Sequence, residues 1–396
     1  MNIPESWDPW AQQRWLAGDR HGAVQATLAV INSKPSPMPP GASMQFVYYV
    51  SMMGDWASAA QMLETLCRDH PDDVQALLNL GVACSRSGQS ARAIEVLRKV
   101  LAINPDHVVA WDSLAAACAR SGRYDEAKLA GEAALQRKHA AAMRAPGIGK
   151  IRPAPQLTAE KRRIIAFSLW GKQPRYLRGA LHNALRVGEL FPGWQCRFYV
   201  DASVPQPFLD SLREVGAELV IDTAPGWDST RRRLTRRFFV ANDSTVGYFL
   251  VRDCDSVLSE REVGAVGEWL ASGRSFHVMR DWWTHTDLML AGMWGGVAGL
   301  LPNIERLTAM YDSNRVETPN WDQWFLRDCI WRRVADDCLI HDRCFQVLDA
   351  RPFPGELPVG NRHVGQDEYA ARRQAQADYL AAWMSRLPCL LEALPA

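Results

Sequence analysis

The chain has 396 residues, of which 47% are hydrophobic and 22% charged, with a net charge of +1 at pH 7, a composition typical of a globular protein and not of a disordered one. The near-zero net charge excludes a general attraction to nucleic acid or anionic lipid. No apolar run is long enough to span a membrane, and residues 1–10 lack the features of a signal peptide. We therefore expect a cytoplasmic protein of about two or three domains, without nucleic-acid partners.

The first third of the chain repeats with a period of 34 residues. Glycines, alanines and prolines recur at this interval, as Gly54, Gly88 and Gly122, as Ala59, Ala93 and Ala127, and as Pro37, Pro71 and Pro105. The period and these residues resemble the tetratricopeptide family, in which each unit is a pair of antiparallel helices. We expect a helical repeat domain over residues 1–140, with about three or four repeats and a degenerate first one at 15–31.

A stack of such repeats presents a concave face that usually binds a polypeptide. We expect this face to bind an acceptor, which would be a peptide, a protein or a glycan. The alternative is that the repeats only cap the next domain or form a homodimer. Residues 141–160, rich in proline and glycine, are typical of a linker.

Beyond the linker, strand-like and helix-like segments alternate. This order predicts an α/β, doubly wound domain at 161–366, with a mostly parallel sheet covered by helices on both faces, followed by a helical segment at 367–396. The expected strands are 164–169, 197–200, 218–221, 248–251 and 275–280, and the expected helices are 176–188, 207–216, 231–242 and 261–272.

The strand expected at 248–251 is followed at once by Arg252, Asp253 and Asp255. In parallel sheets, ligands gather beyond the carboxyl ends of the strands. If the backbone stays extended, Asp253 and Asp255 point the same way and can share a hard divalent cation whose remaining ligands are phosphate oxygens. The pattern favours a metal and diphosphate site, with Arg252 as a further nucleotide contact. The alternative is a polar strand end, because Asp-x-Asp is common by chance.

Two other stretches supply candidate nucleotide contacts. The first expected strand ends near Ser168 and Trp170, where the indole could stack on a base. The basic stretch 231–237, if helical, places Arg233 and Arg237 on one face, suited to a diphosphate. The alternatives are a simple turn with a core tryptophan, and solvated surface charge.

Three later features point to the sugar side of such a site. Gly292 lies in a glycine-bearing loop at 288–296 that would let a sugar approach the backbone. Asp322 and Gln323 begin an amphipathic helix, where Asp322 is either a site residue or a helix cap. His363 can give a nitrogen ligand to a manganese-like ion, or else it is an ordinary surface histidine.

The order of these pieces resembles the metal-dependent glycosyltransferases of the GT-A fold, in particular glycosyltransferase family 8. The resemblance covers about residues 160–366. It implies that Asp253 and Asp255 chelate Mn²⁺ or Mg²⁺ and touch the ribose, while His363 completes the metal site. It also implies a nucleotide-sugar donor, with a UDP-sugar favoured. The leading hypothesis is a bacterial-type cytoplasmic glycosyltransferase.

The same resemblance implies that Gly292 lines the sugar pocket and that Asp322 and Gln323 stand near the anomeric carbon. The family's lysine after His-x-Gly is missing here, so an arginine from 231–237 or Arg362 must replace it. An inverting reaction would need a carboxylate to deprotonate the acceptor, and Asp281 or Asp322 is the candidate. The alternatives are an interaction scaffold with an inactive transferase-like domain, or a nucleotidyltransferase that uses the same metal and diphosphate site.

Overall fold

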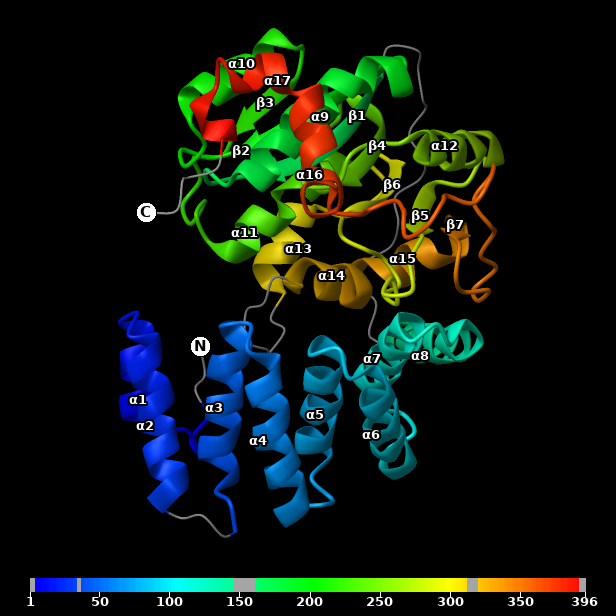
Figure 1. Ribbon diagram of the computed structural model, residues 1–396. Coiled ribbons are helices and arrows are strands. Elements are labelled where there is room, and N and C mark those ends of the chain that lie inside the picture. Colours follow the sequence, from blue (N-terminus) through cyan, green and yellow to red (C-terminus); the bar gives the residue numbers. More distant parts are fainter. Residues whose placement is uncertain (1–3, 34–36, 145–160, 312–319, 392–396) are drawn as a thin grey trace. The chain divides into compact units, whose positions relative to one another are not determined.

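The computed structural model describes residues 4–33, 37–144, 161–311 and 320–391. The chain folds into two compact units, 1–137 and 138–396. The first unit is helical and the second is built on a β-sheet (Figure 1).

The first unit is a series of helices in which each helix from α1 to α7 contacts the next (Figure 1). The helices are α1 (Pro9–Leu16), α2 (Arg20–Ser33), α3 (Pro40–Met52), α4 (Trp56–Asp69), α5 (Val74–Arg86), α6 (Ser90–Ile103), α7 (Val108–Arg120) and α8 (Tyr124–Arg144). The last of these crosses the boundary between the units. The expected pairs of helices are present in the structure.

The repeated glycines explain how one helix of a pair leads to the next. Gly54, Gly88 and Gly122 each follow a helix with a positive φ of 84°, 84° and 73°. This left-handed conformation ends a helix and is costly for any residue with a Cβ. Gly81 has another reason, because a Cβ there would lie 2.6 Å from Cγ of Leu97 on the neighbouring helix. The 34-residue period therefore reflects turn geometry and close helix packing.

The second unit contains a seven-stranded sheet of order β3-β2-β1-β4-β6-β5-β7. The strand β6 runs antiparallel to both of its neighbours, and the other pairs are parallel. The strands are β1 (Arg162–Leu169), β2 (Trp194–Val200), β3 (Glu218–Ile221), β4 (Val246–Arg252), β5 (Phe276–Arg280), β6 (Met293–Val297) and β7 (Cys338–Asp342). The expected helical repeat region is thus followed by a mixed, largely parallel sheet.

Helices and short helical turns connect these strands. They are α9 (Pro174–Leu190), α10 (Gln206–Glu214), α11 (Thr230–Thr235), η1 (Arg236–Asn242), α12 (Glu260–Ser272), α13 (Ile304–Met310), α14 (Trp321–Phe325), η2 (Leu326–Ile330), α15 (Trp331–Val334), η3 (Ala335–Asp337), α16 (Glu368–Tyr379), α17 (Ala381–Met384) and η4 (Pro388–Leu390). The helix expected at 231–242 is therefore α11 followed by the 3₁₀ turn η1.

Residues of β1 alternate between the two faces of the sheet. Phe167 and Leu169 belong to a buried apolar cluster that also includes residues of α9, α10 and α12. Ser168, between them, accepts a hydrogen bond from the backbone N–H of Arg237 in η1. Since neighbouring strand residues point to opposite faces, the α9 side and the η1 side cover different faces of the sheet. The expected coverage of both faces is observed.

The strand β6 was expected to be part of a loop because it contains glycines. A Cβ on Gly295 would lie 2.5 Å from the carbonyl oxygen of Phe249, and one on Gly296 would lie 2.6 Å from the ring of Phe276. The two glycines therefore let β6 fit between β4 and β5. Glycine weakens a strand by propensity, but here close packing against the neighbouring strands decides the structure.

The helices of the structure also bear on the expected membrane spans and on the expected linker. No helix among the described residues is long and apolar enough to cross a membrane. The helix α8 continues through Arg144, so the first residues of the expected linker are helical, while 145–160 lie outside the described residues.

Candidate functional site

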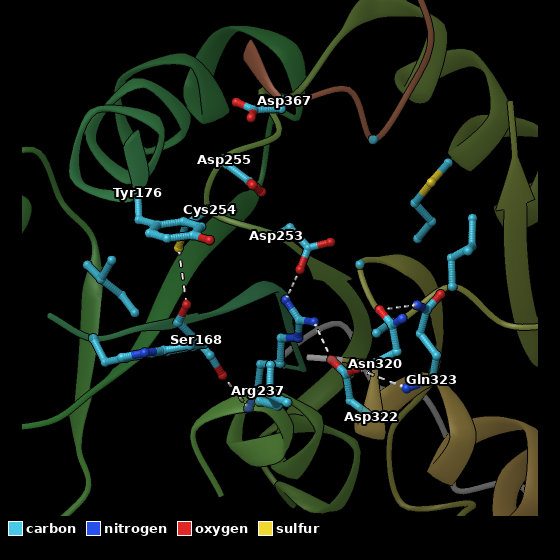
Figure 2. A pocket seen from close by; sticks show the side chains of 18 of the residues that line it. Ser168, Tyr176, Arg237, Asp253, Cys254, Asp255, Asn320, Asp322, Gln323 and Asp367 are labelled. Atoms are coloured by element: carbon cyan, nitrogen blue, oxygen red, sulfur yellow. Dashed lines mark hydrogen bonds and ion pairs between the residues drawn. The ribbon is translucent and has the colours of Figure 1, made fainter. Parts of the chain in front are cut away.

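A cavity of about 550 Å³ opens at the carboxyl edge of the sheet, beyond β1 and β4 (Figure 2). The chain leaves β1 through α9 toward β2 on one side, whereas β4 pairs with β1 on the other side. A crevice forms at such a reversal of strand order, and ligands of open α/β sheets bind there. Ser168 and Trp170 line the cavity from β1, and Asp253 and Asp255 line it from β4.

The side of the cavity next to β1 has aromatic walls. Trp170 and Tyr176, at the start of α9, are stacked with ring centroids 6.5 Å apart and planes at 22°. Both residues line the cavity. The expected position of Ser168 and Trp170 at the site is therefore observed, and a planar ring could stack on these side chains.

Asp253 and Gly292 meet because β6 is antiparallel. The register pairs Arg252, the last residue of β4, with Met293, the first residue of β6. Gly292 therefore lies at the carboxyl edge of β4, and a Cβ there would be 1.9 Å from Oδ2 of Asp253. The absence of a side chain at Gly292 leaves room for the carboxylate in the cavity.

The helix α9 supports the loop that carries Asp253 and Asp255. Gly179 packs so closely that a Cβ would lie 1.8 Å from the carbonyl oxygen of Cys254. The amide of Asn183 donates to the carbonyl of Ser256 at 2.8 Å, and its oxygen accepts from the N–H of Leu258 at 2.9 Å. Close packing and these two bonds hold the loop against the helix.

Arg237 is a buried guanidinium that connects Asp253 with Asp322 (Figure 2). Its Nη1 forms an ion pair with Asp253 and donates to the carbonyl of Arg252 at 3.0 Å, while its Nη2 lies 3.1 Å from Oδ2 of Asp322. Of the two candidate arginines in the basic stretch 231–237, Arg237 therefore lines the cavity.

Asp322 lines the cavity but is itself almost fully buried. Burial raises its pKa to about 7, Arg237 acts in the opposite direction, and the charge of Asp253 adds to the increase. Asn320, not Asp322, is the N-cap residue of α14, so Asp322 is not a helix cap. Gln323 lines the same cavity, and its amide donates to Asn320 at 3.4 Å.

Asp255 shares a guanidinium with Asp367. Nη2 of Arg175 forms an ion pair with Asp255 and lies 3.1 Å from Oδ2 of Asp367. Burial raises the pKa of Asp255, the negative charge of Asp253 raises it further, and Arg175 lowers it. Asp367 reaches this position because it pairs in an isolated bridge with Ser256.

Sequence reasoning did not assign Arg175, His285 or Asp367 to the site. A signal was available for Arg175, because it lies in the first turn of the helix that follows β1. His285 lines the cavity, and its Nδ1 accepts the N–H of Asp281, so the ring proton is on Nε2. Burial lowers its pKa to about 3, so the ring is neutral. No local pattern points to Asp367, which depends on a contact with a distant loop.

Three expected site residues lie away from the cavity because ion-pair partners hold them. Arg233 pairs with Asp201 at 3.0 Å, and Arg252 with Glu262 at 2.5 Å. Both carboxylate oxygens of Asp281 lie 3.0 Å from Arg261, and Asp281 is fully buried. The structure therefore does not bring Arg233 or Arg252 to the cavity as nucleotide contacts, or Asp281 as a base.

His363 is not among the residues that line this cavity. Its ring stacks on Trp282 with centroids 4.7 Å apart, and its Nδ1 donates to the carbonyl of Asn361 at 2.8 Å. It faces a different hollow, together with Arg362. The structure therefore does not place His363 with Asp253 and Asp255, and Arg362 does not replace the family's lysine in this cavity.

Asp253 and Asp255 are the carboxylates of the cavity that were expected to bind a divalent cation. Among the described residues, no group of three or more His, Cys, Asp or Glu is arranged to hold a metal ion. Asp253 and Asp255 face one cavity, and burial together with the negative charge of Asp253 raises the pKa of Asp255. Mg²⁺ is commonly bound by one or two carboxylates together with substrate phosphates. Asp253 and Asp255 therefore suit a cation whose other ligands are diphosphate oxygens. They do not suit a cation that is bound by protein side chains alone.

Comparison with known proteins identifies the first unit. Residues 52–118 and 86–145 match the tetratricopeptide repeat model, so the N-terminal region contains these repeats, as the period predicts. No curated protein gives a significant match. Similar solved structures include a crystal structure of MamA, at 18% identity over 34% of this chain and 81% of that chain, with a TM-score of 0.30.

A second similar structure is that of a mutant of Thermobaculum terrenum O-GlcNAc transferase. It is 19% identical over 61% of this chain, with a TM-score of 0.39. The alignment covers 44% of that transferase, less than half of its length. TM-scores of 0.30 and 0.39 do not establish a shared fold or a shared activity.

Proposed function

We propose that the second unit is a GT-A-like, metal-dependent glycosyltransferase that moves a sugar from a nucleotide-sugar donor to an acceptor. The observation that carries the proposal is the position of Asp253 and Asp255 in a cavity at the reversal of strand order, which Trp170 and Tyr176 also line. Carboxylates suit a cation with its diphosphate, and the aromatic side chains of the same cavity suit a base. A UDP-sugar with Mn²⁺ or Mg²⁺ is the donor to test first.

In the reaction, the bond between the anomeric carbon and a diphosphate oxygen breaks, and an acceptor oxygen bonds to that carbon. Asp253 and Asp255 would hold the cation, which stabilises the negative charge that develops on the leaving diphosphate. Arg237 fixes the position of Asp253 and neutralises part of the charge of Asp322.

Asp322 is the candidate to take the acceptor's proton if the reaction inverts the anomeric configuration. It lines the cavity, and with a pKa of about 7 it is partly ionised at neutral pH. A base whose pKa lies near the working pH is well suited to proton transfer. Of the two candidates, the buried Asp281 is held by Arg261 and does not line the cavity, so Asp322 is the one proposed for the role.

The repeat unit is proposed to recruit a polypeptide acceptor. It contains a cavity of about 580 Å³ whose walls include Trp7, Tyr48 and Trp56. Gln75 and Asn79 add amide groups, and no charged side chain lines this cavity among the described residues. Aromatic and amide groups suit the uncharged parts of an extended peptide.

Thermal unfolding with ligands tests the donor site. A ligand that binds the native state at 100 times its Kd stabilises the protein by about 2.7 kcal/mol. We expect UDP or GDP to raise the Tm in the presence of Mn²⁺, and we expect Asp253→Asn and Asp255→Asn to lose the increase. The exposed Asp210→Asn on α10 is the control and should respond like the unmodified protein. Nucleotides that leave the Tm unchanged with and without Mn²⁺ would support an interaction scaffold instead.

The products distinguish transfer of a sugar from transfer of a nucleotide. With a nucleotide-sugar and Mn²⁺, a glycosyltransferase releases a nucleoside diphosphate and either a glycoside or the free sugar. A nucleotidyltransferase instead leaves the sugar phosphorylated and transfers the nucleoside monophosphate. Mass spectrometry of the reaction mixture separates these outcomes, and a sugar phosphate as the main product would contradict the proposal.

A further inference from the structure

A second hollow, of about 200 Å³, lies beside the segment that carries Asp367. Gln366 and Glu368 line this hollow, whereas Gly365 and Asp367 line the proposed donor cavity. The segment therefore separates two cavities and contributes side chains to both. The hollow is several times larger than the roughly 30 Å³ that one water molecule takes up in the liquid. It has room for a small polyatomic ion.

Arginines dominate the walls of this hollow. They are Arg186, Arg261, Arg362 and Arg372, which come from separate parts of the unit, and only two carboxylates, Glu260 and Glu368, line it with them among the described residues. Like charges gathered in one hollow repel each other, and an anion relieves that repulsion. The wall therefore carries an excess of positive charge.

The four arginines differ in how firmly they are paired. Arg261 is held by the buried Asp281, and Arg186 lies 2.9 Å from the exposed Glu260. Arg372 is only 3.5 Å from Glu368, a loose contact. The Arg362 side chain makes no hydrogen bond or ion pair within the described part of the chain. Two guanidinium groups are thus available to a ligand without the loss of a strong internal bond.

Two neutral groups complete the wall. Because the carbonyl of Asn361 can only accept, Nδ1 of His363 carries the ring proton, and Nε2 is left as an acceptor in the neutral ring. Burial lowers the pKa of His363, which favours this neutral form. The side chain of Ser259 makes no capping hydrogen bond to α12. The guanidinium and hydroxyl groups can donate to the oxygens of a phosphate group. Nε2 of His363 can accept from the O–H of a protonated phosphate.

The hollow adjoins another one that holds an unpartnered buried nitrogen. Arg186, Glu368 and Arg372 also line this second space, together with His182. Nδ1 of His182 is buried without a hydrogen-bond partner in the described structure, and the residue is 6% exposed. An unpaired buried polar atom is costly, but this nitrogen has almost no accessible surface, so a ligand in the hollow does not reach it unless the neighbouring side chains move.

We infer that this arginine-lined hollow is a binding site for a phosphate group. The site is distinct from the proposed donor cavity, and the inference does not depend on glycosyl transfer. The anion could be free phosphate or a phosphate ester, such as a sugar phosphate. Arginine recognises the phosphate group in both cases.

Isothermal titration calorimetry of the full chain tests the site with two probes, inorganic phosphate and glucose 6-phosphate, in a buffer without nucleotide or metal. We expect saturable binding of at least one probe, and we expect the double variant Arg362→Ala/Arg372→Ala to weaken it by about tenfold or more, since charge-assisted hydrogen bonds are lost. The control is Arg373→Ala, which removes the neighbouring arginine of the same helix. Arg373 stacks on Tyr369 and is not among the residues that line the hollow.

The outcomes separate specific binding from general attraction. Binding that is lost in the double variant and kept in Arg373→Ala supports the site, and tighter binding of the ester than of free phosphate identifies a phosphorylated molecule as the ligand. Absence of saturable binding by both probes, or equal loss in the control, would overturn the inference. Binding of UDP with Mn²⁺ to the same variants is measured in parallel. If that binding fails in the unmodified protein while phosphate still binds, the proposed function fails and this inference stands.

Discussion

At the scale of single residues, Gly292 controls the position of a carboxylate in the cavity. A methyl group at this position would lie 1.9 Å from Oδ2 of Asp253, well inside van der Waals contact. The nearest obstacle is the Asp253 side chain, which can rotate away, and the backbone nitrogen of Asp253 at 3.1 Å requires only a small shift. The expected damage is therefore to ligand binding and not to stability.

We predict that Gly292→Ala weakens the binding of Mn²⁺ with UDP by at least about tenfold, because one of two carboxylates is displaced. Calorimetric titration measures the affinity, and circular dichroism checks that the Tm stays close to that of the unmodified protein. The control is Gly267→Ala in α12, where a Cβ meets nothing within 4 Å. That change should leave the affinity unchanged. Unimpaired binding by Gly292→Ala would show that Asp253 does not hold the cation.

Asp322 makes the stability of the second unit depend on pH. Its pKa is about 7 in the folded protein against 3.8 in a free chain, because burial favours the protonated form. Between these values the folded state keeps a proton that the unfolded state has released. Stability therefore falls as the pH rises toward and through 7.

We predict that the free energy of unfolding falls by about 2 to 3 kcal/mol between pH 5 and pH 8 through this one carboxyl group. Asp322→Asn cannot ionise and should remove most of this fall. Urea unfolding of both proteins at pH 5, 6, 7 and 8 gives the two curves. Parallel curves would mean that Arg237 keeps Asp322 ionised throughout this range.

At the scale of elements, the helix α9 fixes the loop that follows β4. Gly179 faces the backbone of Cys254, where a Cβ would lie 1.8 Å from the carbonyl oxygen, whereas Gly188 of the same helix has nothing within 4 Å of a Cβ. Backbone atoms cannot rotate away, so the steric cost should exceed the gain of about 1 kcal/mol that alanine brings to a helix.

We predict that Gly179→Ala lowers the free energy of unfolding by about 1 to 3 kcal/mol and also weakens nucleotide binding. Gly188→Ala in the same helix should instead raise stability by about 0.5 to 1 kcal/mol, with binding unchanged. Chemical denaturation and titration of the two variants measure both quantities. An equal gain in stability from both changes would show that the loop moves freely relative to α9.

The elements that the sequence predicts well are those whose signal is local. The strands β1 to β5 and the 34-residue repeat follow from apolar runs and spaced glycines. The strand β6 was missed because its glycines are favourable only through contact with Phe249 and Phe276, which lie elsewhere in the chain. Long-range packing of this kind leaves no periodic pattern.

The site residues were also predictable only where the signal in the sequence is local. Asp253 and Asp255 were predictable because they directly follow a buried strand. Asp367 enters the cavity only through its bridge to Ser256, and His363 turns instead to Trp282 and Asn361. A histidine two residues before a glycine in the sequence does not specify which of two adjacent hollows its ring faces. Only the folded chain decides that.

At the scale of the whole molecule, two units with different architectures share one chain. A repeat array is stabilised by contacts within and between neighbouring repeats, so its stability is close to a sum of local terms. In the second unit, a buried cluster instead joins residues far apart in the chain, from β1, β2, α9, α10 and α12. A ligand in the cavity beyond β4 should therefore protect the second unit as a whole, and the repeats little.

Hydrogen exchange of the full chain, followed by mass spectrometry, tests this with and without UDP and Mn²⁺. We predict slower exchange across 161–311 and 320–391 and no change across 37–120, because ligand binding raises only the opening free energies of structures that the ligand stabilises. The C-terminal part of α8 should follow the second unit, since Lys138 is bound to the carbonyl of Thr286 at 2.8 Å and to Asp287 at 2.9 Å. Asp253→Asn is the control that should abolish the protection. Slower exchange within 37–120 would instead reveal coupling between donor binding and the surface proposed to recruit the acceptor.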